Sequence, residues 1–230
     1  MFFLDELLKD MSKRLVILLS LIFLLFTSCL NYNQVTTIKT DSSGEMFIHY
    51  WMQWEDKQDS VWLKRLHIFN EDSIRTEFYS NQNNIERIET FLNYKDSTIH
   101  AQIEFEFQNF DSLKYTKAFE GANFTLVDGP EGTKVFSQFI SPFATGFGVK
   151  SDKFKISLTY YLPGEILEHN AHKKSRNKLT WDYTLSDIGT GQKITAKFRP
   201  FRLKETPEWV YYSTLFVLIV VIFYLFKKRK

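Results

Sequence analysis

Histidines and carboxylates between positions 165 and 172 are the residues of this chain best suited to chemistry. His169 and His172 stand three apart beside Glu165 and Glu168, and imidazole and carboxylate groups are common ligands of zinc. A metal site needs several ligands that converge with fixed geometry, and no helix is expected here to orient them. The basic residues at 173, 174 and 176 would also repel a cation. We therefore expect a solvated polar loop and no metal.

Catalysis finds little support elsewhere in the chain. There is no Gly-x-Ser-x-Gly, no glycine-rich phosphate loop and no His-Glu-x-x-His pattern. The pair Glu104 and Glu106 alternates with Phe105, which is typical of the solvated face of a sheet. With 29 basic and 27 acidic residues, the chain lacks the strong positive charge of a nucleic-acid binder. We expect no enzyme, no cofactor and no nucleic-acid partner.

The N-terminal end has the parts of an export signal. Lys13 and Arg14 precede an apolar run at 15–26, and the small residues Thr27 and Ser28 follow it. The run of about 12 residues is too short to span a bilayer core of about 30 Å. Three acidic residues in the first ten positions are unusual for such a signal, so Met11 is a second candidate for the start of translation.

Cys29, the only cysteine, comes directly after these small residues. This arrangement resembles the bacterial lipobox, in which the cysteine thiol receives a diacylglycerol and the peptide bond before it is cut. The resemblance implies a lipoprotein signal peptide over residues 1–28 and lipidation of Cys29, and two acyl chains anchor far more firmly than one. A small core residue or a spare thiol is the alternative.

The C-terminal end carries a second apolar segment. Residues 209–226 contain no charge, aromatic residues stand at the start of this stretch, and the basic tail 227–230 follows. Such a pattern predicts a transmembrane helix over 207–226 with a cytoplasmic tail, and the alternative is a buried helix of a soluble core. The domain at 29–206 is then expected outside the cytoplasm, at the bacterial inner membrane.

Between these ends the dominant hydrophobic period is two. Residues 98–108 alternate apolar and polar side chains, as in a half-buried antiparallel strand. Further strands are expected at 35–40, 45–53, 86–93, 124–127, 133–140, 154–162, 178–185 and 193–201. Helices are expected at 73–80, capped by Asp72, and at 112–119, capped by Asp111. The predicted fold is α+β, a predominantly antiparallel curved β-sheet with about two helices packed on one side, plus the C-terminal transmembrane helix.

Aromatic residues supply the candidates for ligand binding. The loop 139–148 is apolar but contains a proline and two glycines, and one hypothesis is a mobile flap that gates a lipid cavity or dips into a membrane. Ordinary core packing is the alternative. Trp181 is expected to be a core anchor whose ring N–H is satisfied, and it can bind ligand only if it lines a cavity. The candidate binding residues are Phe139, Phe143, Phe147 and Trp181.

Several short motifs occur in a recognisable order. They are the hairpin residues Asp41 and Gly44, the strand end Leu162-Pro163-Gly164, then Asn170, then Trp181. With the lipobox and the terminal apolar segment, this order resembles LppM-type bacterial lipoproteins, although Ala171 follows Asn170 where that family usually has a glycine soon after. The resemblance implies an exported, membrane-tethered α+β domain of a kind associated with lipid or glycolipid binding in mycobacteria. It implies no catalytic residue.

The sequence thus predicts a non-catalytic envelope lipoprotein whose partners are membrane lipids, both covalently attached at Cys29 and bound by the domain. The rival hypothesis is a protein-interaction or assembly module tethered to the inner membrane, with an unknown protein partner. An elongated apolar cavity would favour the lipid binder, and a sealed dry core would favour the rival.

Overall fold

The computed structural model describes residues 30–54, 67–142, 154–201 and 207–227. The chain up to Pro200 forms one compact unit, and Phe201 onward forms another. Cys29, the signal peptide predicted at 1–28, Phe143 and Phe147 lie outside the described residues, as do the basic residues after Lys227.

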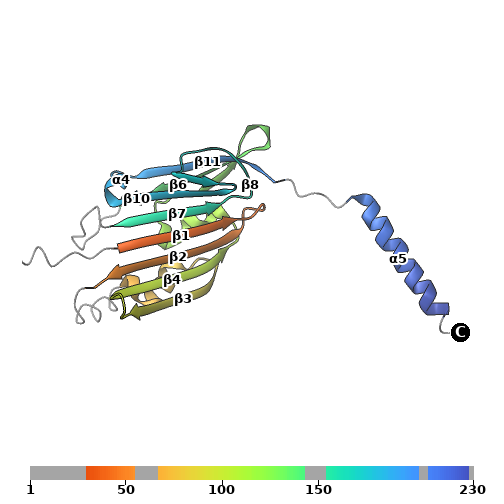
Figure 1. Ribbon diagram of the computed structural model, residues 1–230, viewed down its shortest axis with the longest axis horizontal. Helices are drawn as coiled ribbons and strands as arrows, with labels where there is room; N and C mark the ends of the chain where they lie inside the picture. The colour runs from red at the N-terminus through yellow and green to blue at the C-terminus, as the bar shows by residue number, and fades with distance from the viewer. Residues whose placement is uncertain (1–29, 55–66, 143–153, 202–206, 228–230) are drawn as a thin grey trace, which may run out of the picture. The chain divides into compact units, whose positions relative to one another are not determined.

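The first unit is built on a seven-stranded sheet in the order β3-β4-β2-β1-β7-β10-β9 (Figure 1). Its strands are β1 (Leu30–Ile38), β2 (Gly44–Gln53), β3 (Asn83–Asn93), β4 (Thr98–Phe107), β7 (Lys155–Tyr161), β9 (Lys173–Ser175) and β10 (Lys178–Thr184). Neighbours pair antiparallel except β1 and β7, which run parallel. In β4 buried and half-buried residues alternate, so one face of the sheet carries the core.

The turn between β1 and β2 confirms the predicted hairpin. Asp41 Oδ1 accepts hydrogen bonds from the backbone N–H and the hydroxyl of Ser43, as short polar side chains do in turns. A Cβ at Gly44 would lie 2.1 Å from the carbonyl oxygen of Thr37. Only glycine therefore allows the two strands to pair right up to the turn, where Gly44 faces Ile38.

A four-stranded sheet in the order β5-β6-β11-β8 forms the other layer of strands. Its strands are β5 (Thr125–Asp128), β6 (Lys134–Ile140), β8 (Gly164–His169) and β11 (Gln192–Pro200). The chain passes from the first sheet to the second through Leu162 and Pro163, because proline cannot continue the ladder. A Cβ at Gly164 would lie 2.2 Å from the carbonyl oxygen of Arg199, so glycine is needed where β8 meets β11.

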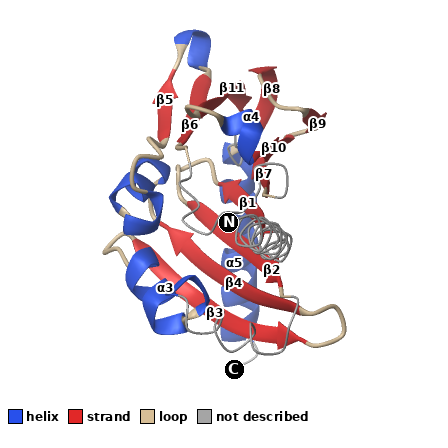
Figure 2. Cartoon of the chain, turned by 90° about the vertical axis from the view of Figure 1, so that its left-hand side faces the viewer, coloured by secondary structure: helices blue, strands red, loops and turns tan. Residues whose placement is uncertain are grey.

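Short helices cover one face of the large sheet (Figure 2). They are η1 (His67–Phe69), α3 (Glu71–Phe78), η2 (Phe110–Tyr115) and η3 (Lys117–Phe119), while η4 (Pro130–Gly132) and α4 (Leu185–Ile188) lie in connections. The cap of α3 is Asn70, whose Oδ1 accepts from Ser73 N at 2.9 Å, and not Asp72. Ile74 and Phe78 are buried, four residues apart on one face.

The expected helix at 112–119 is instead two 3-10 helices. Asn109, not Asp111, caps the first of them and accepts from Asp111 N. The helical conformation is interrupted at Thr116, which lies between the two helices and has an extended backbone. Between the sheets and this cover, aromatic rings pack against one another, some edge to face and others tilted. Phe110 contacts Phe124 at 5.3 Å and Phe136 at 5.4 Å.

The predicted fold class needs correction. The strands form two sheets that are not curled, not one curved sheet, and the large sheet is mixed because β1 pairs with β7 in parallel. The polar loop expected around Glu165 is mostly strand β8, which contributes only Gly164 and Ile166 to the core. A strand with so few buried residues has little hydrophobic alternation from which it could be predicted.

The predicted transmembrane helix was also wrong. The second unit contains α5 (Glu208–Lys227), and no helix in the described parts of the chain is both long and apolar enough to cross a membrane. Hydroxyl-bearing residues at 211–214 occupy its first turns. These polar groups shorten the apolar stretch, whereas a span needs about 20 predominantly apolar residues.

Candidate ligand-binding cavity

A cavity of about 510 Å³ lies within the first unit, between the large sheet and its helical cover. Its walls come from β1, β2 and β7 on one side and from η1, α3, η3 and β6 on the other. Most of the lining is apolar, including Leu30, Met52, Ile74, Phe78, Ile156 and Leu158. Ligand pockets in proteins typically measure about 300–1,000 Å³ and are lined mainly by apolar side chains.

The floor of the cavity follows from strand alternation. Tyr32 on β1 faces Tyr50 on β2 and Ile156 on β7 in the ladder. Residues two positions along each strand lie on the same face, so Gln34 and Leu158 extend the floor as the next cross-strand pair. Three neighbouring strands thus present their inward side chains to one space.

Tyr50 attaches the cover to this floor. Its hydroxyl donates a hydrogen bond to the carbonyl oxygen of Ile68 in η1. Its ring stacks on Tyr32 with centroids 6.3 Å apart and contacts Phe69 at 5.5 Å. His67 Nδ1 lies 3.1 Å from the hydroxyl of Ser73 in α3, so η1 is fixed to both the sheet and the neighbouring helix.

Phe139 on β6 contributes to the cavity wall. It is the predicted binding residue, among those that the structure describes, that lines the cavity. Its position depends on Gly191, whose φ is +120° and whose added Cβ would lie 2.2 Å from Phe139 Cζ. The side chain of Phe139 therefore occupies space that any other residue at 191 would fill. Phe143 and Phe147 are not described.

A polar cluster, buried except for the half-buried Tyr32, reaches the apolar lining through Tyr32, Gln34 and Gln138. It consists of Tyr32, Gln34, Thr36, Gln138 and Tyr160. Tyr32 donates to Gln34 Oε1 at 3.2 Å, and Gln34 Nε2 donates to Thr36 at 3.0 Å and to Tyr160 at 2.9 Å. The Tyr160 hydroxyl donates in turn to Gln138 Oε1 at 2.6 Å. Buried polar groups are tolerated when they are paired in this way.

The tyrosines near the cavity remain uncharged. Burial raises the pKa of Tyr32 well above its ordinary value, and the nearby Tyr50 raises it further. Burial likewise raises the pKa of Tyr50 and of Tyr160, because an apolar environment disfavours the phenolate. These hydroxyls therefore act as neutral hydrogen-bonding groups.

Charged groups of the lining are few. Glu77 and Glu120 line the cavity, and Glu77 is paired with Lys117 at 2.5 Å on an exposed surface. Among the described lining residues there is neither lysine nor arginine. The described lining thus offers an anionic ligand no lysine or arginine, and its one imidazole is that of His67.

Trp181, also a predicted binding residue, lies outside the described cavity lining. It is 0% exposed and donates its ring N–H to Asn170 Oδ1 at 2.9 Å. Asn170 Oδ1 also accepts from Thr195 N at 2.8 Å, and its Nδ2 donates to Lys193 O at 2.7 Å. Asn170 therefore joins β10 of one sheet to β11 of the other.

The histidines considered for metal binding have other contacts. His169 Nδ1 accepts from Ala171 N, and His172 Nδ1 accepts from Asp182 N. Within the described residues, no group of three histidine, cysteine or carboxylate side chains could hold an ion.

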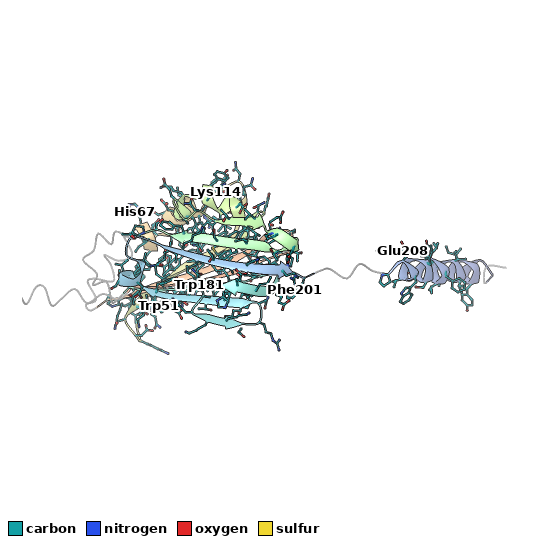
Figure 3. All side chains as sticks on the ribbon, turned by 90° about the horizontal axis from the view of Figure 1, so that it is seen from above. Trp51, His67, Lys114, Trp181, Phe201 and Glu208 are labelled. Atoms are coloured by element: carbon teal, nitrogen blue, oxygen red, sulfur yellow. The ribbon has the colours of Figure 1, made fainter. Side chains whose placement is uncertain are left out.

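The opposite face of the large sheet carries a second aromatic cluster. His49 Nε2 and His100 Nδ1 lie 3.0 Å apart, and the His100 ring stacks on Phe91 with centroids 4.7 Å apart. Trp51 stacks on His49 at 4.8 Å; Figure 3 shows it on the other side of the domain from Lys114. Burial and the neighbouring His100 lower the pKa of His49, and burial lowers that of His100.

The sequence did not single out Tyr32, Gln34 or Gln138. The only signal was their inward position in alternating strands, where a polar residue interrupts an apolar face. Gln34 is 1% exposed and Gln138 is 6% exposed. A buried glutamine on a strand usually needs such partners.

Fold and site together define a two-sheet domain with an apolar cavity beneath short helices. No family model and no curated protein matches the chain. Among solved structures, the chain is similar to the folded domain of the LppM protein of Mycobacterium tuberculosis, with a TM-score of 0.46 and 13% identity over 76% of this chain and 91% of that one. The similarity is distant and assigns no family, so the LppM-type resemblance stays a prediction.

Proposed function

We propose that this protein is a lipoprotein of the bacterial envelope whose domain binds the acyl part of a lipid without catalysing a reaction. The observation that carries the proposal is the apolar cavity of about 510 Å³ between the large sheet and α3. Burial of an acyl chain there would be favourable by about 0.8 kcal/mol per CH₂ group.

The position of the cavity next to the predicted lipidation site supports the membrane as the source of this ligand. Leu30 lines the cavity and directly follows Cys29, the predicted lipidation site. A diacylglycerol on Cys29 would hold this end of β1 at the membrane surface. A lipid leaving the bilayer would then have only a short distance to travel to the cavity.

The cavity also helps to choose between the two functions considered from the sequence, a lipid-binding domain and a protein-interaction module. A protein-interaction module needs no internal space, and a sealed core would have favoured it. A cavity of this size favours the lipid binder.

The test is native mass spectrometry of the full-length protein, purified from bacteria and released from detergent, followed by extraction and identification of bound lipid. Ala122→Phe places a ring in the cavity, which Ala122 lines. Ala171→Phe is the matched control, because both alanines are partly buried against the core and Ala171 does not line the cavity.

We expect bound acyl lipid in the unmodified protein and in Ala171→Phe, and its loss in folded Ala122→Phe. Equal lipid content in all three proteins, or no lipid in any after envelope lipids are added, would contradict the proposal. The same spectra test the anchor, since the mature chain should begin at Cys29 with the added mass of a diacylglycerol.

A further inference from the structure

Building on the proposed lipid binding, we infer that the polar cluster of Tyr32, Gln34 and Gln138 selects a lipid whose polar end is uncharged, such as an acylglycerol with an ester and a hydroxyl. The selection would be against lipids that end in a carboxylate or a phosphate.

Not every hydrogen-bonding group of the cluster has a partner within it. Gln34 uses both Nε2 hydrogens, one to Thr36 and one to Tyr160. Gln138 uses only its Oε1, which accepts from Tyr160, and its Nε2 has no partner among the described residues. A primary amide can donate two hydrogen bonds, so two donors on Gln138 are free.

These donors are open to the cavity. Within the described residues, the one side-chain polar atom that is both sealed from solvent and without a partner is Asn83 Oδ1. The Gln138 nitrogen therefore touches open space, and Gln138 lines the cavity. The Tyr32 oxygen, which donates to Gln34, keeps a lone pair that can accept. A donor and an acceptor thus stand together in an apolar lining.

The cavity suits an uncharged polar group better than an anion. Removing a carboxylate or phosphate from water is costly unless a cation or several donors compensate it. The described lining contains Glu77, Glu120 and the imidazole of His67 but no lysine or arginine, and the raised pKa of Tyr32 keeps its hydroxyl neutral. An ester carbonyl can accept from Gln138, and a hydroxyl can donate to Tyr32, without any charge being buried.

The test compares ligands that share one chain of twelve carbons: monododecanoylglycerol, dodecanoate, dodecyl phosphate and dodecane. Affinities for the full-length protein are measured by displacement of a fluorescent fatty-acyl probe, below the concentrations at which the ligands form micelles. We expect monododecanoylglycerol to bind at least about tenfold more tightly than the two anions and than dodecane, which corresponds to about 1.4 kcal/mol.

Variants then assign the preference to the cluster. Gln138→Leu removes the donors, and we expect the preference for monododecanoylglycerol over dodecane to fall about tenfold. Gln138→Glu keeps an acceptor for Tyr160 and serves if the leucine variant does not fold; it should lose the same preference at neutral pH. Gln102→Leu, on the outer face of β4, is the control and should leave the preference unchanged.

The outcomes separate the two proposals. If all four ligands bind with similar affinity, or the anions bind more tightly, lipid binding stands and the selection for an uncharged end is wrong. If none binds, both proposals fail. An unchanged preference in folded Gln138 variants would also overturn the role of the cluster.

Discussion

Replacing Asn170 by alanine should destabilise the domain through the indole of Trp181. Asn170 Oδ1 accepts from the Trp181 ring N–H at 2.9 Å, and Trp181 is 0% exposed. A buried donor that loses its acceptor costs about 1–3 kcal/mol. The two backbone contacts of Asn170, at Thr195 N and Lys193 O, lie in exposed surroundings, so water can replace them at about 0.5–1 kcal/mol each.

The expected loss is therefore about 2–5 kcal/mol in the free energy of unfolding. Urea unfolding of the full-length protein, followed by far-ultraviolet circular dichroism, measures it without relying on tryptophan emission. Asn170→Asp is the matched variant. It keeps an oxygen for both N–H donors and loses only the bond to Lys193 O, so a smaller cost of about 1 kcal/mol is expected.

A double-mutant cycle isolates the indole contribution. In the background of Trp181→Phe there is no ring N–H, so Asn170→Ala should cost about 1–3 kcal/mol less than in the unmodified protein. An equal cost in both backgrounds would show that the stabilisation does not run through this hydrogen bond. A total loss below about 0.5 kcal/mol, the size typical of surface substitutions, would refute the reasoning altogether.

Two further perturbations test the cavity and its tyrosines. Gly191→Ala should cost about 1–3 kcal/mol of stability by backbone strain and also weaken lipid binding, because the new Cβ displaces Phe139. The control Gly132→Ala, with φ of +70° and nothing within 4 Å, should show the strain alone. Equal lipid affinity in both variants would contradict this prediction. Because burial raises the pKa of Tyr160 above the ordinary 10.0, its contribution to stability is complete below that pH and is lost as the pH rises above it. Denaturation at increasing pH should show a shallower decline for Tyr160→Phe than for the exposed control Tyr79→Phe, and identical declines would count against a buried phenol.

Local patterns predicted the strands well, for a physical reason. The strand expected at 98–108 is β4, Thr98–Phe107, because one buried face imposes a strict period of two. The turn at Asp41 and Gly44 was equally clear, since its chemistry involves only neighbouring residues. The caps were less certain because Asn70 and Asp72 are both good capping residues, and only the backbone geometry selects Asn70.

Long-range arrangement could not be predicted in the same way. Nothing in the alternation of the strands indicates that Asn31 pairs with Lys155, or that β8 and β11 belong to a second sheet. The cavity has the same difficulty, because its lining comes from seven elements and from connections between them. Of the predicted binding residues, Phe139 lines the cavity, but Gln34 on β1 and Gln138 on β6 belong to different sheets and are brought together only by the packing of the domain.

The place of β1 in the sheet has a consequence for how the protein is made. β1 gains its partner β2 almost at once during synthesis, but its other edge stays open until the residues of β7, from Lys155 onward, have emerged. An open edge is a template for pairing with another chain, and contacts between distant residues form slowly. Chains that stop before β7 are therefore expected to aggregate, and a newly made chain would depend on protection of β1 until its last neighbour arrives.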